Sequence, residues 1–181
     1  MAITDSQIID ACVLINLLAT GEIAGILKSA SLTSLICAVV EKETIYLRTG
    51  DPQNPQELVQ ISPLIETGLL TICQPEGPDE ETLYVDYASV LDDGEAMTLA
   101  IAVSRGLVLV TDERKARRLF VQDVGEPKRL IASSEILRKW TEAQNVPSEK
   151  IREVLLGIES RARYRPPQDD PNFDWWVKSS Q

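Results

Sequence analysis

The run "LVLV" at residues 107–110 restricts the fold of this chain more than any other feature. An unbroken aliphatic run of this kind predicts a strand that is covered on both faces, as in a parallel sheet. Similar short runs occur at "QIID", "LTSLI", "LLTICQP" and "RLIA", and they alternate with segments of helical character. This alternation predicts an α/β fold with a mostly parallel central sheet.

Helical spacing of apolar residues predicts the elements between these strands. The expected helices are "CVLINLLATGE", "EIAGILKSA", "AVVEKETIYLR", "DEETLYVDYASVL", "LDDGEAMTLAIAVSRG", "SEILRKWTEAQ" and "SEKIREVLLGIESRAR". The segment "TGDPQNPQ" is typical of a loop because of its Pro, Gly and Asn content. From Tyr164 onward no regular element is expected, although the apolar Trp175 and Trp176 should dock on the protein.

Length and composition indicate a globular chain with one main domain. The chain has 181 residues, of which 44% are hydrophobic and 25% charged. We expect a main domain over residues 1–145 and a C-terminal helix and tail over residues 146–181. No stretch reaches the roughly 20 apolar residues of a membrane span. The N-terminus lacks a basic region before an apolar one, so a signal peptide is not expected and a cytoplasmic location is.

The absence of histidine excludes several kinds of chemistry at once. Ser-His and Cys-His catalysis, histidine general bases and histidine metal ligands are all ruled out. The three cysteines match no CxxC spacing, so neither a disulfide framework nor a zinc site is predicted. The net charge of −10 argues against a general nucleic-acid coat protein but leaves room for a local basic patch.

Two aspartates follow predicted strands. Asp10 comes at the end of the first strand and Asp112 after "LVLV", and ligands of open α/β sheets bind at this edge. Glu95 and Glu43 could converge on the same place, where clustered carboxylates would need a cation such as Mg²⁺. The alternative is that each acid has a local role, as a helix cap, a first-turn dipole partner or a solvated residue.

Four basic residues follow Asp112 in the segment "DERKARRLF". Cations in the first turn of a helix oppose the helix dipole, so another interaction must favour them. Contact with an anion such as a phosphate would explain Arg114, Arg117 and Arg118, as would ion pairs with neighbouring acids. Both explanations remain open at this point.

Taken in order, four motifs resemble those of the PIN domain, the PilT N-terminus-like nucleases that include VapC-type toxins. The motifs are "IIDACVLINLL", "VVEKETIYLR", "LDDGEAMTLAIA" and "LVLVTDERKAR", and the resemblance covers about residues 7 to 145. It implies a three-layer α/β/α sandwich around a parallel sheet. It also implies a ribonuclease that depends on Mg²⁺ or Mn²⁺.

The resemblance assigns roles to individual residues. Asp10 and Asp112 match the first and last acids of the family, with Thr111 as the neighbouring hydroxyl, and Glu95 matches the third acid. As second acid, "EKE" offers Glu41 and Glu43, which differ by about 200° around a helix, so only one can face the site. Glu43 is preferred because it precedes the apolar "IYL" turn. The implied metal ligands are Asp10, Glu95 and Asp112, and the implied substrate-binding residues are Thr111, Arg114, Arg117 and Arg118.

The leading hypothesis is therefore a metal-dependent endoribonuclease acting on RNA. A toxin role would add a small antitoxin protein as partner, a homodimer is a further expectation, and no membrane partner is expected. One alternative is a PIN-like module that binds RNA or protein without cutting. Another is a receiver-like signalling domain, but that would need a lysine late in the sheet, and "RLIASS" supplies none.

Overall fold

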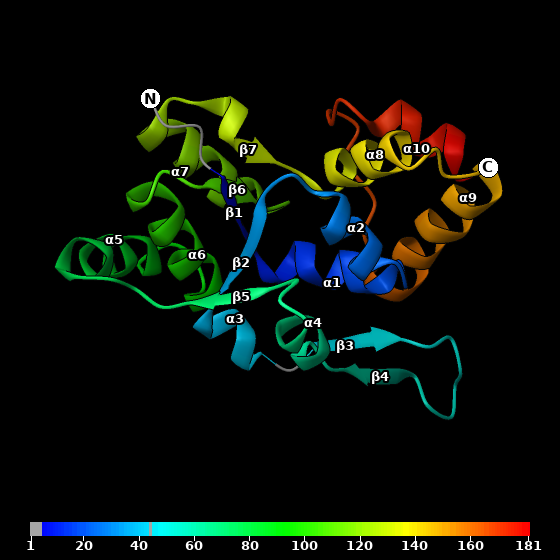
Figure 1. Ribbon diagram of the computed structural model, residues 1–181, viewed down its shortest axis with the longest axis horizontal. Coiled ribbons are helices and arrows are strands. Elements are labelled where there is room, and N and C mark those ends of the chain that lie inside the picture. Colours follow the sequence, from blue (N-terminus) through cyan, green and yellow to red (C-terminus); the bar gives the residue numbers. More distant parts are fainter. Residues whose placement is uncertain (1–4, 44) are drawn as a thin grey trace. The chain divides into compact units, whose positions relative to one another are not determined.

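The computed structural model describes residues 5–43 and 45–181 (Figure 1). The chain forms two compact units, which are described separately below. The first contains residues 5–13, 31–43 and 61–132, and the second contains residues 14–30, 45–60 and 133–181. The predicted division at residue 145 stays a prediction.

A five-stranded sheet forms the centre of the first unit. Its strands are β1 (Ser6–Ile9), β2 (Thr33–Cys37), β5 (Thr71–Cys73), β6 (Val108–Val110) and β7 (Leu130–Ile131). They lie in the order β5-β2-β1-β6-β7, and every neighbouring pair is parallel. The predicted "LVLV" strand is confirmed, since Val108, Leu109 and Val110 are all buried.

Helices flank this sheet. They are α3 (Ala38–Lys42), α4 (Ser62–Glu66), α5 (Pro78–Ala88), α6 (Asp93–Ser104), α7 (Arg114–Val124) and the short 3₁₀ helix η1 (Pro127–Arg129). Helix α6 contacts β1, β2 and β6 and lies between α5 and α7 (Figure 1). It is apolar around most of its circumference, as a helix packed on several sides must be. Together with the parallel sheet, this arrangement confirms the predicted α/β/α fold class.

The strand order of the sheet reverses direction at one point, between β1 and β6. After β1 the chain adds β2 and then β5 on one side, and later adds β6 and β7 on the other side of β1. Ligands of open α/β sheets bind where the order reverses, outside the carboxyl ends of the strands. Asp10 directly follows β1, and Thr111 and Asp112 directly follow β6, so these residues lie at the reversal point.

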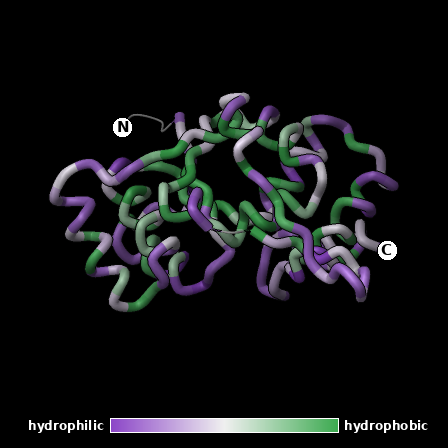
Figure 2. The backbone as a smooth tube through the Cα atoms, turned by 90° about the horizontal axis from the view of Figure 1, so that it is seen from below, coloured by the Kyte–Doolittle hydropathy of each residue, from purple (hydrophilic) through white to green (hydrophobic). Residues whose placement is uncertain are grey.

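The second unit combines helices with a two-stranded hairpin. Its elements are most of α1 (Ala11–Ala19), α2 (Ile23–Ser29), β3 (Ile45–Arg48), β4 (Gln56–Val59), α8 (Ser133–Ala143), α9 (Ser148–Gly157), the π-helical turn η2 (Ile158–Ala162) and α10 (Phe173–Ser179). Strands β3 and β4 are antiparallel. Figure 2 shows green hydrophobic stretches interrupted by purple hydrophilic turns along the whole chain.

The C-terminal tail is ordered, contrary to the expectation that it lacks regular structure. Trp176 in helix α10 is completely buried, and its indole Nε1 donates to Glu159 at 2.7 Å. The ring of Trp176 also packs edge-to-face on Tyr164, with centroids 5.7 Å apart. Asp170 accepts hydrogen bonds of 2.9 Å from Ser134 in α8. The predicted docking of the tryptophans is confirmed, with Trp175 half-buried.

The predicted helix over residues 38–48 is wrong in its second half. Helix α3 ends at Lys42, and Ile45, Tyr46 and Leu47 instead belong to strand β3. β-branched and aromatic residues of this kind favour strands when a partner strand is present. That partner, β4, was not predicted because its sequence "QELV" is too short to show a period.

In the described part of the chain no single helix could cross a membrane, and the apolar pair α1 and α2 is bent by 116°.

Candidate functional site

Asp10 is a buried carboxylate at the reversal point of the sheet. Only 2% of the residue is exposed. Its Oδ2 accepts hydrogen bonds from Thr111 Oγ1 at 2.7 Å and from Cys12 Sγ at 3.3 Å, and its Oδ1 accepts one from the Ala11 backbone N–H at 2.8 Å. The carboxylate is therefore fixed in orientation by contacts from both β6 and the start of α1.

Burial raises the pKa of Asp10, and the nearby charge of Asp92 raises it further. The three hydrogen bonds to the carboxylate act in the opposite direction but do not cancel the effect of burial. An ionised Asp10 is thus destabilised in the folded protein. A cation close to the carboxylate would relieve this cost.

Helix α6 adds two more carboxylates at its first turn. Asp92 caps the helix, because its side chain accepts from the Glu95 backbone N–H at 2.8 Å. Burial, followed by the charges of Asp92, Asp10 and Glu113, raises the pKa of Glu95 to about 7. Glu95 is therefore poised to exchange a proton near neutral pH.

Glu43 reaches the same group from the end of α3. It is the C-cap residue of that helix and is exposed, so it lies just beyond the helix on which it was predicted. Burial by its neighbours and the charges of Asp92 and Asp10 raise its pKa. We refer to Asp10, Glu43, Asp92 and Glu95 as the acid cluster, because the charges of Asp92 and Asp10 both raise the pKa values of Glu43 and Glu95.

Asp112 lies beside Cys12, at the edge of the acid cluster. The Asp112 backbone hydrogen-bonds to the Cys12 thiol, and the charge of Asp112 raises the pKa of this thiol, although burial is the main cause. The adjacent Thr111 is completely buried. Its hydroxyl donates to Asp10, and its predicted role in substrate binding stays a prediction.

The basic segment after Asp112 divides into anchored and exposed side chains. Arg117 donates from Nη1 to the Thr111 carbonyl at 2.8 Å, and the Lys115 ammonium hydrogen-bonds to the Val90 carbonyl. Arg114 and Arg118 are exposed. Arg117, one of the predicted substrate-binding residues, thus stabilises the turn between β6 and α7.

The donor chemistry of the acid cluster suits a hard divalent cation, although the cluster is not a closed metal cage. Over residues 5–43 and 45–181, no group of three or more His, Cys, Asp or Glu side chains is close enough together to hold a metal ion. Mg²⁺ commonly binds one or two carboxylates and keeps several waters. Among the described residues, no Lys or Arg forms an ion pair with Asp10, Glu43 or Glu95, so their charge is left for such an ion to neutralise.

Sequence reasoning missed two members of this environment. Asp92 was not among the predicted site residues, yet its charge raises the pKa values of Asp10, Glu43 and Glu95. Cys12 was not among them either, yet its thiol donates to Asp10. The adjacency of "DD" to Glu95 in "LDDGEA" was a signal for Asp92, whereas a cysteine two residues after an aspartate gives no comparable signal.

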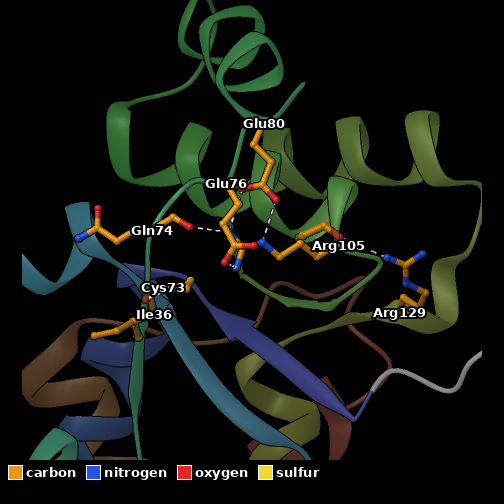
Figure 3. A network of polar contacts seen from close by, with 8 residues as sticks. Ile36, Cys73, Gln74, Glu76, Glu80, Arg105 and Arg129 are labelled. Carbon is orange, nitrogen blue, oxygen red and sulfur yellow. Dashed lines mark hydrogen bonds and ion pairs between the residues drawn. The ribbon is translucent and has the colours of Figure 1, made fainter. Parts of the chain in front are cut away.

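The first unit contains a second, quite different buried carboxylate. Glu80 in α5 is also 2% exposed, but Arg105 donates to both of its oxygens, at 2.8 and 2.9 Å. Figure 3 shows the Arg105 guanidinium also directed at Glu76 and at the Gln74 carbonyl. These hydrogen bonds lower the pKa of Glu80. This network ties the loop after β5 to α5 and to the end of α6.

Comparison with known proteins supports one family. A family model described as a PIN domain matches residues 6–122, which include every member of the acid cluster as well as Asp112. No curated protein and no solved structure matches the chain. The matched region contains strands β1, β2, β5 and β6 of the first-unit sheet. The chain therefore belongs to the PIN domain family.

Proposed function

We propose that this protein is a metal-dependent endoribonuclease that hydrolyses phosphodiester bonds of RNA at the acid cluster. The observation that supports this most strongly is the buried Asp10, which accepts from Thr111 at the point where the strand order reverses and whose pKa is raised by burial and by the charge of Asp92. Strongly perturbed acids in such a position are typical of functional sites.

In this proposal Asp10, Glu95 and Asp112 would bind Mg²⁺ or Mn²⁺, one or two of them directly and the rest through waters of the ion, because the described carboxylates do not form a closed cage. When bound, such an ion lowers the pKa of a coordinated water and stabilises the charge of the phosphodiester. Thr111 and Cys12 keep the Asp10 carboxylate in one orientation through their hydrogen bonds. Glu43 is exposed and has a raised pKa, so it is suited to accept a proton from the attacking water. We assign contact with the phosphates of RNA to Arg114 and Arg118, because their side chains are exposed.

The test is cleavage of labelled RNA and single-stranded DNA by the full chain with Mg²⁺, Mn²⁺ or EDTA. We expect RNA to be cut with either metal and not in EDTA. Asp10→Asn should lower the rate roughly 100-fold or more, by analogy with the loss of a major electrostatic contributor. Asp93→Asn is the matched control, because Asp93 starts the same helix but is exposed and accepts a hydrogen bond from Tyr84. Equal rates for wild type and Asp10→Asn would contradict the proposal.

A second candidate function is a PIN-like module that binds RNA without cutting it. The observation in its favour is that no three metal-binding side chains in the described residues are already gathered around one point. RNA binding by the wild type, without cleavage under any metal, would establish this function instead. A toxin role would further require growth arrest on expression and rescue by a small co-encoded antitoxin protein.

A further inference from the structure

Gly94 is the second residue of α6, and it is in contact with the acid cluster. A Cβ atom built on Gly94 would lie only 2.6 Å from Oε1 of Glu43. The same Cβ would lie 3.6 Å from Oδ1 of Asp92 and 3.6 Å from Cγ2 of Val40. Carboxylate oxygens of Glu43 and Asp92 thus both lie close to the space that the missing side chain leaves free.

Two ordinary reasons for a glycine do not apply at this position. Gly94 lies within the regular helix α6 and is not among the residues with a positive φ, so its backbone conformation is open to any residue. Packing against α3 does not require a glycine either, since the 3.6 Å approach to Val40 is a normal contact. Glycine in a helix costs about 0.5–1 kcal/mol relative to alanine, so its presence needs another reason.

We propose that Gly94 is a positioning residue that admits the Glu43 carboxylate to the acid cluster. Only the Glu43 oxygen lies closer than a Cβ could tolerate. This oxygen is at the end of an exposed, flexible side chain, so a Cβ at position 94 would displace the carboxylate and leave the helix backbone in place. The proposal also favours Glu43, rather than Glu41, as the second acid. Its catalytic consequence rests on the proposed function, whereas the steric relation between Gly94 and Glu43 does not.

The first test is the steric relation itself, measured in EDTA without RNA. Thermal melts followed by circular dichroism compare Gly94→Ala in the wild-type and Glu43→Ala backgrounds. If Gly94 acts through Glu43, the two changes are not additive. Gly94→Ala should raise the melting temperature fully only when Glu43 has been truncated. An equal shift in both backgrounds would overturn the proposal.

Gly25→Ala is the matched control for the same melts. Gly25 lies within α2, and a Cβ there would meet only Trp140 Nε1 at 3.9 Å, an ordinary contact. This variant should raise the melting temperature by the same amount whether or not Glu43 is present. It therefore separates the general gain of helix stability from the specific clash at position 94.

The second test is catalytic. Gly94→Ala should lower kcat for RNA cleavage about 10- to 100-fold, because displacing a catalytic group by about 1 Å has effects of this size. KM should change little, since the exposed arginines are not altered. In the Glu43→Ala background the same substitution should have no further effect on kcat. Full activity of Gly94→Ala would overturn the proposal. A wild type that neither cuts RNA nor binds Mn²⁺ would refute the proposed function and leave the melt result standing.

Discussion

Asp10 and Glu80 are equally inaccessible to solvent, with 2% of each residue exposed, yet Asp10 lies deeper in the protein and the two carboxyl pKa values are shifted in opposite directions. Arg105 neutralises Glu80 and lowers its pKa. Asp10 accepts hydrogen bonds from a hydroxyl, a thiol and a backbone amide, no Lys or Arg in the part of the chain that the structure describes forms an ion pair with it, and its pKa is raised. Burial alone therefore says little about the role of an acid.

The difference shows which carboxylate serves stability and which is available for chemistry. A buried charge with a well-aligned partner is part of the folded framework, and removal of one partner leaves the other uncompensated. A buried charge without such a partner destabilises the folded state until a ligand neutralises it. The four predictions below test this distinction, starting with the largest expected effect.

Removing Arg105 should destabilise the protein strongly. Arg105→Met leaves Glu80 buried without its cation, and we expect a loss of about 3 kcal/mol, at the low end for buried pairs because the arginine is 22% exposed. Urea unfolding followed by circular dichroism measures this. The double variant Arg105→Met/Glu80→Gln should recover much of the loss. A loss below about 0.5 kcal/mol would show that the pair behaves like a surface ion pair.

Neutralising Asp10 should stabilise the protein, which is the opposite of the effect of removing Arg105. In EDTA, Asp10→Asn removes a buried charge that has no cation, and we expect a gain of about 1 kcal/mol, or about 2–4 °C in melting temperature. The gain should disappear in millimolar Mn²⁺, because the metal would then stabilise only the wild type. If Asp10→Asn destabilised the protein in EDTA, the ionised Asp10 would contribute to the stability of the folded state, as Glu80 does.

The pH dependence of stability should follow from the raised pKa values in the acid cluster. Glu95 has a pKa of about 7 in the folded protein against an ordinary value of 4.5, so the folded state holds an extra proton between these values. Stability in EDTA should therefore fall as pH rises from about 5 to 8. Glu80, with its lowered pKa, affects stability only in the acid range, where stability falls as pH drops.

Melts across this pH range test the contribution of Glu95. Glu95→Gln should flatten the profile, and so should saturating Mn²⁺, because a bound metal displaces the proton. The same slope in Glu95→Gln as in the wild type would show that another group holds the proton.

The smallest expected effect concerns two basic residues of α7, Arg117 and Arg118. Arg117 is anchored to the Thr111 carbonyl, whereas Arg118 is exposed. Arg118→Gln should leave the melting temperature unchanged and lower the salt dependence of RNA binding by about 0.7 in the log–log slope, the value for one phosphate contact on a single strand. Binding is measured in Ca²⁺ by fluorescence anisotropy. Arg117→Gln should instead lower the melting temperature, and the reverse pattern would exchange the two roles.

Much of the first unit follows from local sequence. The aliphatic "LVLV" run, the apolar face of α6 and the glycine after it suffice to predict a helix followed by a buried parallel strand. Asp10 and Asp112 could be placed at one edge because parallel strands bring their carboxyl ends together. Their surroundings could not be predicted, because the hydrogen bond from Thr111 to Asp10 joins residues 101 positions apart.

The errors have a common physical cause. Residues 45–48 were predicted to continue the helix that begins at residue 38, and pairing with β4 makes them a strand. The tail contains many Pro and Asp residues, yet Asp170 accepts from Ser134 and Trp176 donates to Glu159, so its order comes from distant partners. Tertiary contacts override local preference at both places.

The docked tail also determines what tryptophan fluorescence can report. The chain has three tryptophans, at positions 140, 175 and 176, and all of them belong to the second unit. Emission during unfolding therefore follows the second unit alone, whereas far-ultraviolet circular dichroism follows both. Coincident curves from the two probes would mean that both units unfold in one cooperative step. Separate curves would show that the first unit, which contains the acid cluster, unfolds in a transition that tryptophan emission does not detect.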